Sequence, residues 1–388
     1  MFFNIKKFVL PLIIFIFLLK IGFLLSERKL VWTDEMWVQN KTINMCSYKD
    51  IFFKLNFPEL NNSPTFFIIQ KLFSDIFSYH YSFPEDNHGL TYVTVHEPRF
   101  QFIMRSPSNI YMSLALAIIF YFFSARFTLI AGFYALATAL SVPMVWMYWV
   151  EAKPYSLWFL LTVLQVLISC DLIMDKHKKN ERAEKWLLLI THLLLAFTVI
   201  NSLIQITIVT FLISLYKKFS YRFMLLLGGL PIAIIFIYIF LSFNHTIGGP
   251  VNPLSSLLDV LMPEHVVFYV IYLILAGWAL IVQKNKIFLN GYVLTLFLLF
   301  LTSAVFFSYY LYYKPMGNIP LHSRYLIYMV PMDIIMTVFV SQGIIKFFWN
   351  SKPVVLCICV VLGWSLALQS LLTYEYIFSQ GLYLHVPG

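Results

Sequence analysis

The feature that most constrains this chain is the repeated occurrence of apolar segments long enough to cross a lipid bilayer. About 20 predominantly apolar residues in a helix span the roughly 30 Å of hydrocarbon. Hydrophobic residues make up 60% of the 388 residues and charged residues only 12%, about half the charged fraction of an ordinary soluble domain. An all-α, polytopic membrane protein is therefore expected.

Eleven spans are predicted, and the whole chain, residues 1–388, is expected to be a single membrane domain without a separate soluble C-terminal domain. The predicted spans are 8–25, 102–123, 128–149, 155–173, 186–200, 203–216, 221–243, 265–282, 287–311, 323–345 and 353–372. Residues 186–216 fit either one long helix or two short ones. A hairpin that turns near Asn201-Ser202 is favoured, because it keeps the two flanking basic clusters on one side of the membrane.

The charged residues divide unevenly between alternate ends of these spans. One set of ends carries fifteen Lys and Arg against four Asp and Glu, whereas the other set carries eleven against thirteen. Because Lys and Arg accumulate on the cytoplasmic side, the N-terminus is predicted to be cytoplasmic and the C-terminus external. The formal charge of +9 then reflects orientation, and no nucleic-acid partner is expected.

The first external segment, residues 26–101, is the longest stretch between predicted spans. Apolar residues at helical spacing in 51–55 and 66–73 predict short helices that lie on the membrane surface. Residues 80–98, rich in His, Pro and Asp, are expected to form an irregular loop. No soluble domain is predicted within this segment.

The same segment contains an acidic pair, Asp34-Glu35, between Trp32 and Trp37. A carboxylate partly desolvated by aromatic neighbours can serve as a general base. Two adjacent carboxylates on irregular backbone can also bind a hard cation. The plainer interpretation is a solvated pair of loop residues, and the local pattern alone favours it.

Further charged residues lie at the external ends of later spans. Arg105 opens the second span, Glu151 and Lys153 lie in the tight turn between the third and fourth, and Arg324 opens the tenth. Arginine can bind a phosphate through two parallel hydrogen bonds, but each of these residues fits equally well as a headgroup-snorkelling or turn residue. Phosphate-binding loops, zinc-binding helices and nucleophile elbows are absent from the sequence, and no nucleotide or redox cofactor is expected.

Taken in order, these motifs resemble those of the C-type membrane glycosyltransferases. This group contains the protein mannosyltransferases and the aminoarabinose lipid A transferases, and the likeness is greatest to the bacterial branch related to lipopolysaccharide-core sugar transferases. The stretches that carry the resemblance are the acidic pair, 62–67, 105–108, 151–157 and 324–326 with Pro331. The resemblance covers roughly residues 8–345.

The resemblance implies sugar transfer from a polyprenyl-phosphate donor to a lipid, glycan or protein acceptor at the external face of a bacterial inner membrane. It implies that Asp34 is the acceptor-activating base or a metal ligand and that Glu35 is its partner, so a divalent metal at this pair stays open. The implied donor-phosphate ligands are Arg105, Lys153 and Arg324, and the implied lining of the donor site is Glu151, Tyr155 and Tyr325. Contact with the acidic pair is the second role implied for Arg105.

The chain departs from the family pattern in ways that leave the acceptor specificity open, and two other functions stay as alternatives. Many relatives have His-Pro-Pro where this chain has Asn62-Ser63-Pro64, and arginine where it has Lys153, a poorer two-pronged phosphate ligand. A transporter or flippase of lipid-linked sugars and a non-catalytic scaffold in a surface-glycan system are the alternatives. A transporter is expected to have internal repeats or charged, broken helices at mid-bilayer, whereas the polar residues of this chain gather at external span ends.

Overall fold

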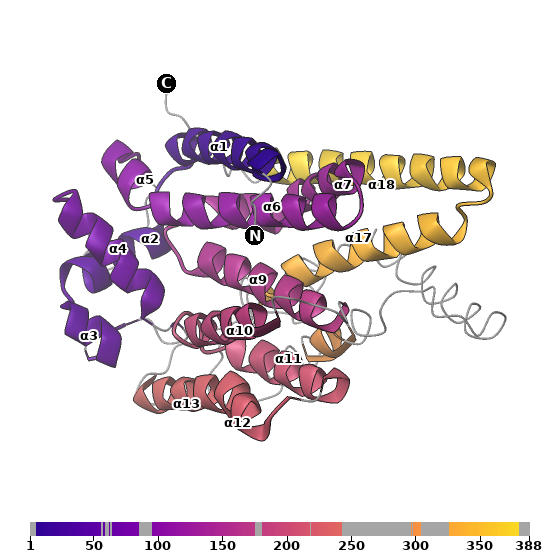
Figure 1. The fold of residues 1–388 in the computed structure, drawn as a ribbon. Coiled ribbons are helices and arrows are strands. Elements are labelled where there is room, and N and C mark those ends of the chain that lie inside the picture. Colours follow the sequence, from indigo (N-terminus) through magenta and orange to yellow (C-terminus); the bar gives the residue numbers. More distant parts are fainter. Residues whose placement is uncertain are drawn as a thin grey trace.

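The computed structural model of the chain describes residues 5–55, 57–58, 62, 64–84, 95–174, 181–217, 219–242, 296, 298–303 and 326–379. These residues form a bundle of helices with two isolated β-bridges and no strand (Figure 1). The all-α prediction is confirmed for this part of the chain. The predicted span 265–282, most of span 287–311, Arg324 and Tyr325 lie outside the described residues.

Six stretches of helix are long and apolar enough to cross a membrane, and a seventh is obtained if a sharply bent pair of helices is one span. The helices that supply these six stretches are α1 (Ile5–Arg28), α5 (Pro98–Ile103) continuing into α6 (Ser106–Arg126), α9 (Tyr155–Met174), α12 (Tyr221–Met224) continuing through the π-helix η2 (Leu225–Gly229) into α13 (Leu230–Ser242), α17 (Met329–Phe347) and α18 (Lys352–Ser379). A polytopic helical membrane protein is supported, but the predicted number of eleven spans is not confirmed.

Helix α6 lies at the centre of the first half of the bundle and packs against α1, α9 and α7 (Leu129–Leu140). Its contact with α1 is close at Gly22, where a Cβ atom would lie 1.8 Å from Asn109 Oδ1. Asn109 uses this space, because its Nδ2 donates to the carbonyl of Leu19 at 3.0 Å while its Oδ1 accepts from Trp149 Nε1 at 3.1 Å. A side chain at position 22 would therefore push α1 away from α6.

The predicted span 128–149 consists of two helices, because the chain bends by 74° between α7 and α8 (Pro143–Trp149). Proline at the first position of a helix cannot continue the hydrogen bonding of the preceding one. Backbone carbonyls released at the break need partners in an apolar surrounding. Trp146 Nε1 donates to the carbonyl of Leu140 at 2.6 Å, and Thr373 Oγ1 of α18 donates to that of Ser141.

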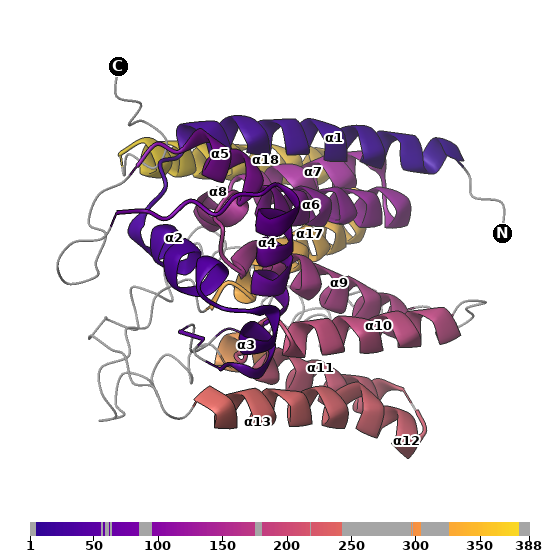
Figure 2. The same ribbon diagram turned by 90° about the vertical axis from the view of Figure 1, so that its left-hand side faces the viewer.

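The predicted hairpin within 186–216 is confirmed. Helix α10 (Glu181–Ala196) and helix α11 (Ser202–Tyr216) are joined by a turn at 197–201, and both lie beside α9 and α13 in Figures 1 and 2. Lys185 near the start of α10 places its Nζ 4.1 Å from the ring centroid of Phe219, just after α11. The start of α10 and the end of α11 therefore lie at the same end of the bundle.

A chain of uncharged polar side chains joins α9, α10 and α11, and we call it the neutral network: Trp158, Thr162, Gln165, His192 and Gln205. Trp158 Nε1 donates to Gln205 Oε1 at 2.9 Å, and Gln205 Nε2 donates to Thr162 Oγ1 and Gln165 Oε1, each at 3.2 Å. Gln165 Nε2 lies 2.9 Å from His192 Nε2, and His192 Nδ1 lies 2.8 Å from the carbonyl of Leu227 in η2.

The direction of every hydrogen bond in the neutral network follows from its two ends. An indole nitrogen can only donate and a backbone carbonyl can only accept. Gln205 therefore turns its oxygen to Trp158, Gln165 turns its amide nitrogen to His192, and His192 donates from Nδ1. Since Nε2 accepts, the imidazole is neutral, and each member of the network has a partner.

Short helices form a layer at one end of the bundle, at the left of Figure 1. They are α2 (Thr33–Trp37), the π-helix η1 (Val38–Asn44), α3 (Tyr48–Phe53), α4 (Thr65–Ile76) and α5. The predicted helices at 51–55 and 66–73 are confirmed as α3 and α4. Asn40 of η1 fixes the stretch around Phe83, which follows α4. Its side-chain amide donates to the Phe83 carbonyl and accepts from the Phe83 N–H, both at 2.9 Å.

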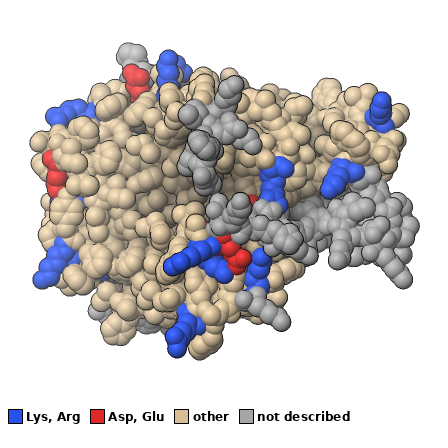
Figure 3. Space-filling model, viewed as in Figure 1, with Lys and Arg blue, Asp and Glu red and all other residues tan. Residues whose placement is uncertain are grey.

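Contacts between distant parts of the chain fix both ends of the bundle. Thr65 at the start of α4 donates its backbone N–H to the carbonyl of Phe197 in the α10–α11 turn at 2.9 Å. At the opposite end Arg126 pairs with Asp171 at 3.3 Å. Broad areas of the face in Figure 3 carry neither acidic nor basic side chains, and Trp364 of α18 is 74% exposed, as expected for lipid-facing surface.

Candidate active site

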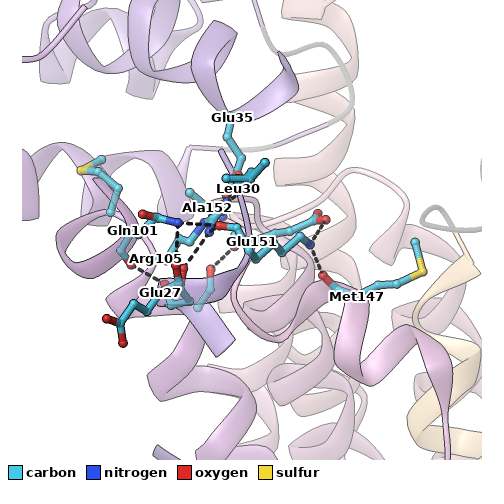
Figure 4. Close-up of polar contacts among 12 residues, drawn as sticks. Glu27, Leu30, Glu35, Gln101, Arg105, Met147, Glu151 and Ala152 are labelled. Atoms are coloured by element: carbon cyan, nitrogen blue, oxygen red, sulfur yellow. Dashed lines mark hydrogen bonds and ion pairs between the residues drawn. The ribbon is translucent and has the colours of Figure 1, made fainter. Parts of the chain in front are cut away.

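Arg105 is the best-anchored charged residue at the layered end of the bundle. It lies between α5 and α6 and is fully buried. Its Nε donates to Glu35 Oε1 at 2.9 Å, and its Nη2 donates to Glu35 Oε2 (Figure 4). Nη1 donates to the carbonyls of Ser26, at 3.1 Å, and Lys29, and Nη2 also donates to that of Leu30 at 2.8 Å.

A guanidinium has five N–H groups, and all five of those on Arg105 are engaged. The structure therefore places Arg105 with the acidic pair, the second of its two predicted roles. It does not present a donor to a phosphate, so its predicted place among the donor-phosphate ligands does not fit this arrangement. Because three of its partners are backbone carbonyls in the last turn of α1 and just after it, Arg105 fixes the course of the chain that leads to the acidic pair.

Glu35 connects three parts of the chain that are far apart in sequence. It is fully buried, and besides accepting from Arg105 its Oε1 accepts from the backbone N–H of Ala152 at 2.7 Å. Ala152 belongs to the turn between α8 and α9. The acidic motif, the start of α6 and the α8–α9 turn therefore meet at one carboxylate.

Asp34 and Glu35 lie in the first turn of α2, where acidic side chains interact favourably with the helix dipole. The expectation of irregular backbone at this pair is wrong. Successive side chains on a helix diverge by about 100°, so Glu35 points inward to Arg105 while Asp34 is half-buried. The two carboxylates do not lie on one face, and Glu35 is already engaged through both oxygens.

Lys29 makes a second buried ion pair at this site, which the sequence analysis missed. Its Nζ donates to Glu151 Oε1 at 2.7 Å and to the carbonyl of Met147 at 2.8 Å (Figure 4). Lys29 is 4% exposed and Glu151 5% exposed. A lysine directly after an apolar span normally suggests snorkelling, so the local pattern around Lys29 does not indicate this inward contact.

Only one of the two carboxylate oxygens of Glu151 accepts a hydrogen bond from the described residues. Its backbone carbonyl accepts from Ser108 Oγ and its Oε1 accepts from Lys29, but its buried Oε2 has no hydrogen-bond partner in the described part of the chain. Burial raises the pKa of this carboxyl, the charge of Glu35 adds to the rise, and Lys29 opposes it. Together Lys29, Glu35, Arg105 and Glu151 form what we call the charged network.

Two further polar residues that the sequence analysis missed complete the packing around the charged network. Gln101 Nε2 donates to the carbonyls of Glu27, at 3.1 Å, and Lys29, at 2.7 Å. Ser26 Oγ donates in turn to the carbonyl of Gln101. These bonds tie the end of α1 to α5, and they satisfy backbone carbonyls of the segment that precedes the acidic pair.

Two other predicted site residues, Lys153 and Tyr155, belong to the same α8–α9 turn and the start of α9. Lys153 and Tyr155 are each 5% exposed; Lys153 donates its backbone N–H to the carbonyl of Glu151 at 2.8 Å, and the Tyr155 ring lies 4.8 Å from that of Tyr148. Arg324 and Tyr325 are outside the described residues. Among the residues that the structure describes, no group of three or more His, Cys, Asp or Glu is arranged to hold a metal ion.

Charged side chains of both signs gather in this region. Lys29, Arg105 and Lys153 are buried together with Glu35 and Glu151, and Asp34 is half-buried beside them. Counted with Asp34, the three cations balance three carboxylates. A partly desolvated carboxylate in such a setting is suited to act as a general base.

No protein-family model matches this chain, and no curated protein matches it at a significant level. The functional interpretation consequently rests on the motifs and on this geometry.

Proposed function

We propose that the chain is a membrane glycosyltransferase that moves a sugar from a polyprenyl-phosphate donor to a lipid, glycan or protein acceptor. The observation that carries the proposal is the double use of Glu35, which binds Arg105 and the N–H of Ala152. These contacts bring together three of the motifs on which the resemblance to C-type glycosyltransferases rests. Motifs that only happened to share the family order would have no reason to meet at one carboxylate.

In the proposed reaction Asp34 accepts the proton of an acceptor hydroxyl or amine. The acceptor atom then forms a bond to the anomeric carbon of the donor sugar. The bond from that carbon to the phosphate oxygen breaks, and its electron pair leaves with the polyprenyl phosphate. Glu35 and Arg105 act as positioning residues for the helix turn that carries Asp34, and Lys153 of the α8–α9 turn is the proposed ligand of the phosphate.

The proposed location is a bacterial inner membrane, with the N-terminus cytoplasmic and the site and C-terminus external. The support is the excess of Lys and Arg at one set of alternate ends of the predicted spans, the set that does not contain the acidic pair. A divalent metal bound with the help of Asp34 stays open. Metal removal and re-addition during the assay below separates a metal-dependent from a metal-independent reaction.

The test is donor turnover by protein in nanodiscs, with undecaprenyl-phosphate glucose, mannose and arabinose as radiolabelled donors and a membrane extract as acceptor. Wild type is expected to release undecaprenyl phosphate and to label an acceptor. Asp34→Asn is expected to lower that rate by about 100-fold or more, because general-base catalysis contributes about 10²–10⁴-fold.

Asp75→Asn is the matched control, since Asp75 is an exposed acid in α4 of the same layer whose side chain accepts a hydrogen bond from Tyr48. It is expected to turn over like wild type. Equal turnover by Asp34→Asn and wild type would remove the proposed role of Asp34. In sealed proteoliposomes, donor moved across the bilayer by wild type without consumption would instead support the transporter alternative.

A further inference from the structure

Glu151 Oε2 is a buried acceptor with nothing in the described part of the chain donating to it. Leaving a charged group unsatisfied inside a protein is costly, and such an atom needs a reason. Lys29 holds the other oxygen, and Ser108 holds the backbone carbonyl of the same residue. The side chain is therefore fixed at one oxygen while the second oxygen is unused.

We propose that Lys29 and Glu151 form a hydroxyl-binding site, in which Glu151 Oε2 accepts a hydrogen bond from a hydroxyl of the donor sugar. Lys29 is the positioning residue, because its bonds to Glu151 Oε1 and to the carbonyl of Met147 fix the carboxylate between α1 and α8. This inference rests on the proposed glycosyltransferase function and adds the atom that recognises the sugar.

The neighbourhood of the unused oxygen favours a neutral polyol over a cation. Glu151 is already paired with Lys29, and Glu35 with Arg105. An ammonium group would add an unbalanced positive charge, whereas a hydroxyl donates without adding charge. Ser156 Oγ, also buried and without a hydrogen-bond partner in the described residues, is a second polar atom close by in sequence.

The geometry also relates this site to Asp34. Glu151 is adjacent to Ala152, whose N–H binds Glu35, and Glu35 is adjacent to Asp34 in the first turn of α2. The sugar-binding oxygen and the proposed base are thus held by one connected set of hydrogen bonds. A sugar bound at Glu151 would be oriented relative to Asp34 by the same contacts that fix the fold.

The test compares the binding of undecaprenyl phosphate with that of its glucose, mannose and arabinose conjugates, in nanodiscs. In wild type at least one conjugate is expected to bind about 10-fold to 100-fold more tightly than the bare lipid, the range of a hydrogen bond to a charged group. The double variant Lys29→Met/Glu151→Met replaces the ion pair by apolar side chains of similar size, an exchange that buried pairs often tolerate. It is expected to lose the preference while it still binds the bare lipid.

Lys29→Arg is the conservative control, and it is expected to keep the preference because a cation still holds Oε1. A double variant that retains the preference, or a wild type that binds every conjugate no better than undecaprenyl phosphate, overturns the hydroxyl site and assigns Oε2 to a bound water. Either result leaves the glycosyltransferase proposal standing if the bare lipid binds. Failure of wild type to bind any of the four lipids overturns both.

Discussion

The charged network and the neutral network both join helices through buried polar side chains, but only one of them is complete. In the neutral network every polar atom of Trp158 and His192 has a partner, and the partners fix each other's orientation. In the charged network Glu151 Oε2 has none among the described residues. Interhelical hydrogen bonds inside a membrane are worth about 0.6 kcal/mol on average, whereas breaking a buried ion pair costs about 3–5 kcal/mol.

The difference teaches how to separate a structural from a functional polar cluster in a membrane bundle. A complete, uncharged network satisfies itself and needs no substrate. An incomplete, charged network at the end of the bundle keeps a buried acceptor whose cost is recovered when a ligand supplies the missing donor. The neutral network therefore serves as the internal standard for the effects expected at the charged one.

The largest effect is expected from Arg105→Leu. This change leaves Glu35 buried without its cation and removes the donors to three backbone carbonyls, at a cost of about 3–5 kcal/mol or more. The measurement is the apparent unfolding midpoint in detergent. Arg105→Lys is expected to rescue little, because a lysine offers three donors without the planar fork; a midpoint near that of wild type for Arg105→Lys would show that charge alone suffices.

A smaller, pH-dependent effect is expected at Glu151. Its pKa is raised in the folded protein, so the folded state holds this proton more tightly than the unfolded state, where the value is about 4.3. Its contribution to stability is then full below that unfolded value and declines as the pH rises toward the folded pKa. The measurement is the unfolding midpoint across the acid range.

Lys29→Met is the variant that sharpens this pH dependence. Without the lysine the decline with rising pH is expected to be steeper, and in the double variant Lys29→Met/Glu151→Met the contribution of this group is expected to vanish. Identical slopes for wild type, Lys29→Met and the double variant would mean that Glu151 does not titrate in this range.

Gln205→Leu tests the neutral network and is expected to cost about 1–2 kcal/mol. The change removes the bonds to Trp158, Thr162 and Gln165, each worth on average about 0.6 kcal/mol. The unfolding midpoint should fall less than in Arg105→Leu, and donor turnover should stay at the wild-type level. Loss of turnover in a folded Gln205→Leu protein would contradict the purely structural assignment of this network.

The smallest effect is expected at an exposed acid of the same layer. Asp50 completes a capping box with Ser47 at the start of α3, and its hydrogen bonds with Ser47 lower the pKa of Asp50. The stability that this cap contributes is present above the unfolded pKa and is lost as the pH falls through the folded one. Asp50→Asn should lower the unfolding midpoint slightly at neutral pH and not at low pH. A change as large as that in Arg105→Leu would contradict the expectation that an exposed charge contributes less to stability than a buried one.

Much of the helical framework was readable from the sequence, because apolar length and charge asymmetry act over whole spans. The basic clusters on either side of 186–216 predicted the hairpin that the Lys185–Phe219 contact shows. The break before Pro143 was missed although the proline is visible, since the residues on both sides are apolar enough to suggest one continuous span. Its stability depends on Thr373, more than 200 residues away.

The candidate site was predictable in its location and only partly in its contacts. Asp34, Glu35, Arg105 and Glu151 were all proposed from their positions at external span ends. Which carboxylate turns inward depends on the helical phase of α2, and α2 is too short to show a periodicity. Lys29 was missed because its partner, Glu151, is 122 residues away and its local context suggests snorkelling.

The most direct test of the central claim is photo-crosslinking with undecaprenyl phosphate that carries a diazirine beside the phosphate, followed by peptide mapping. The account predicts that labelled peptides come from residues 33–37 and 150–156, and that excess unlabelled undecaprenyl phosphate removes the label. Labelling confined to the opposite end of the bundle, near Arg126 and Lys185, would contradict a donor site at the charged network.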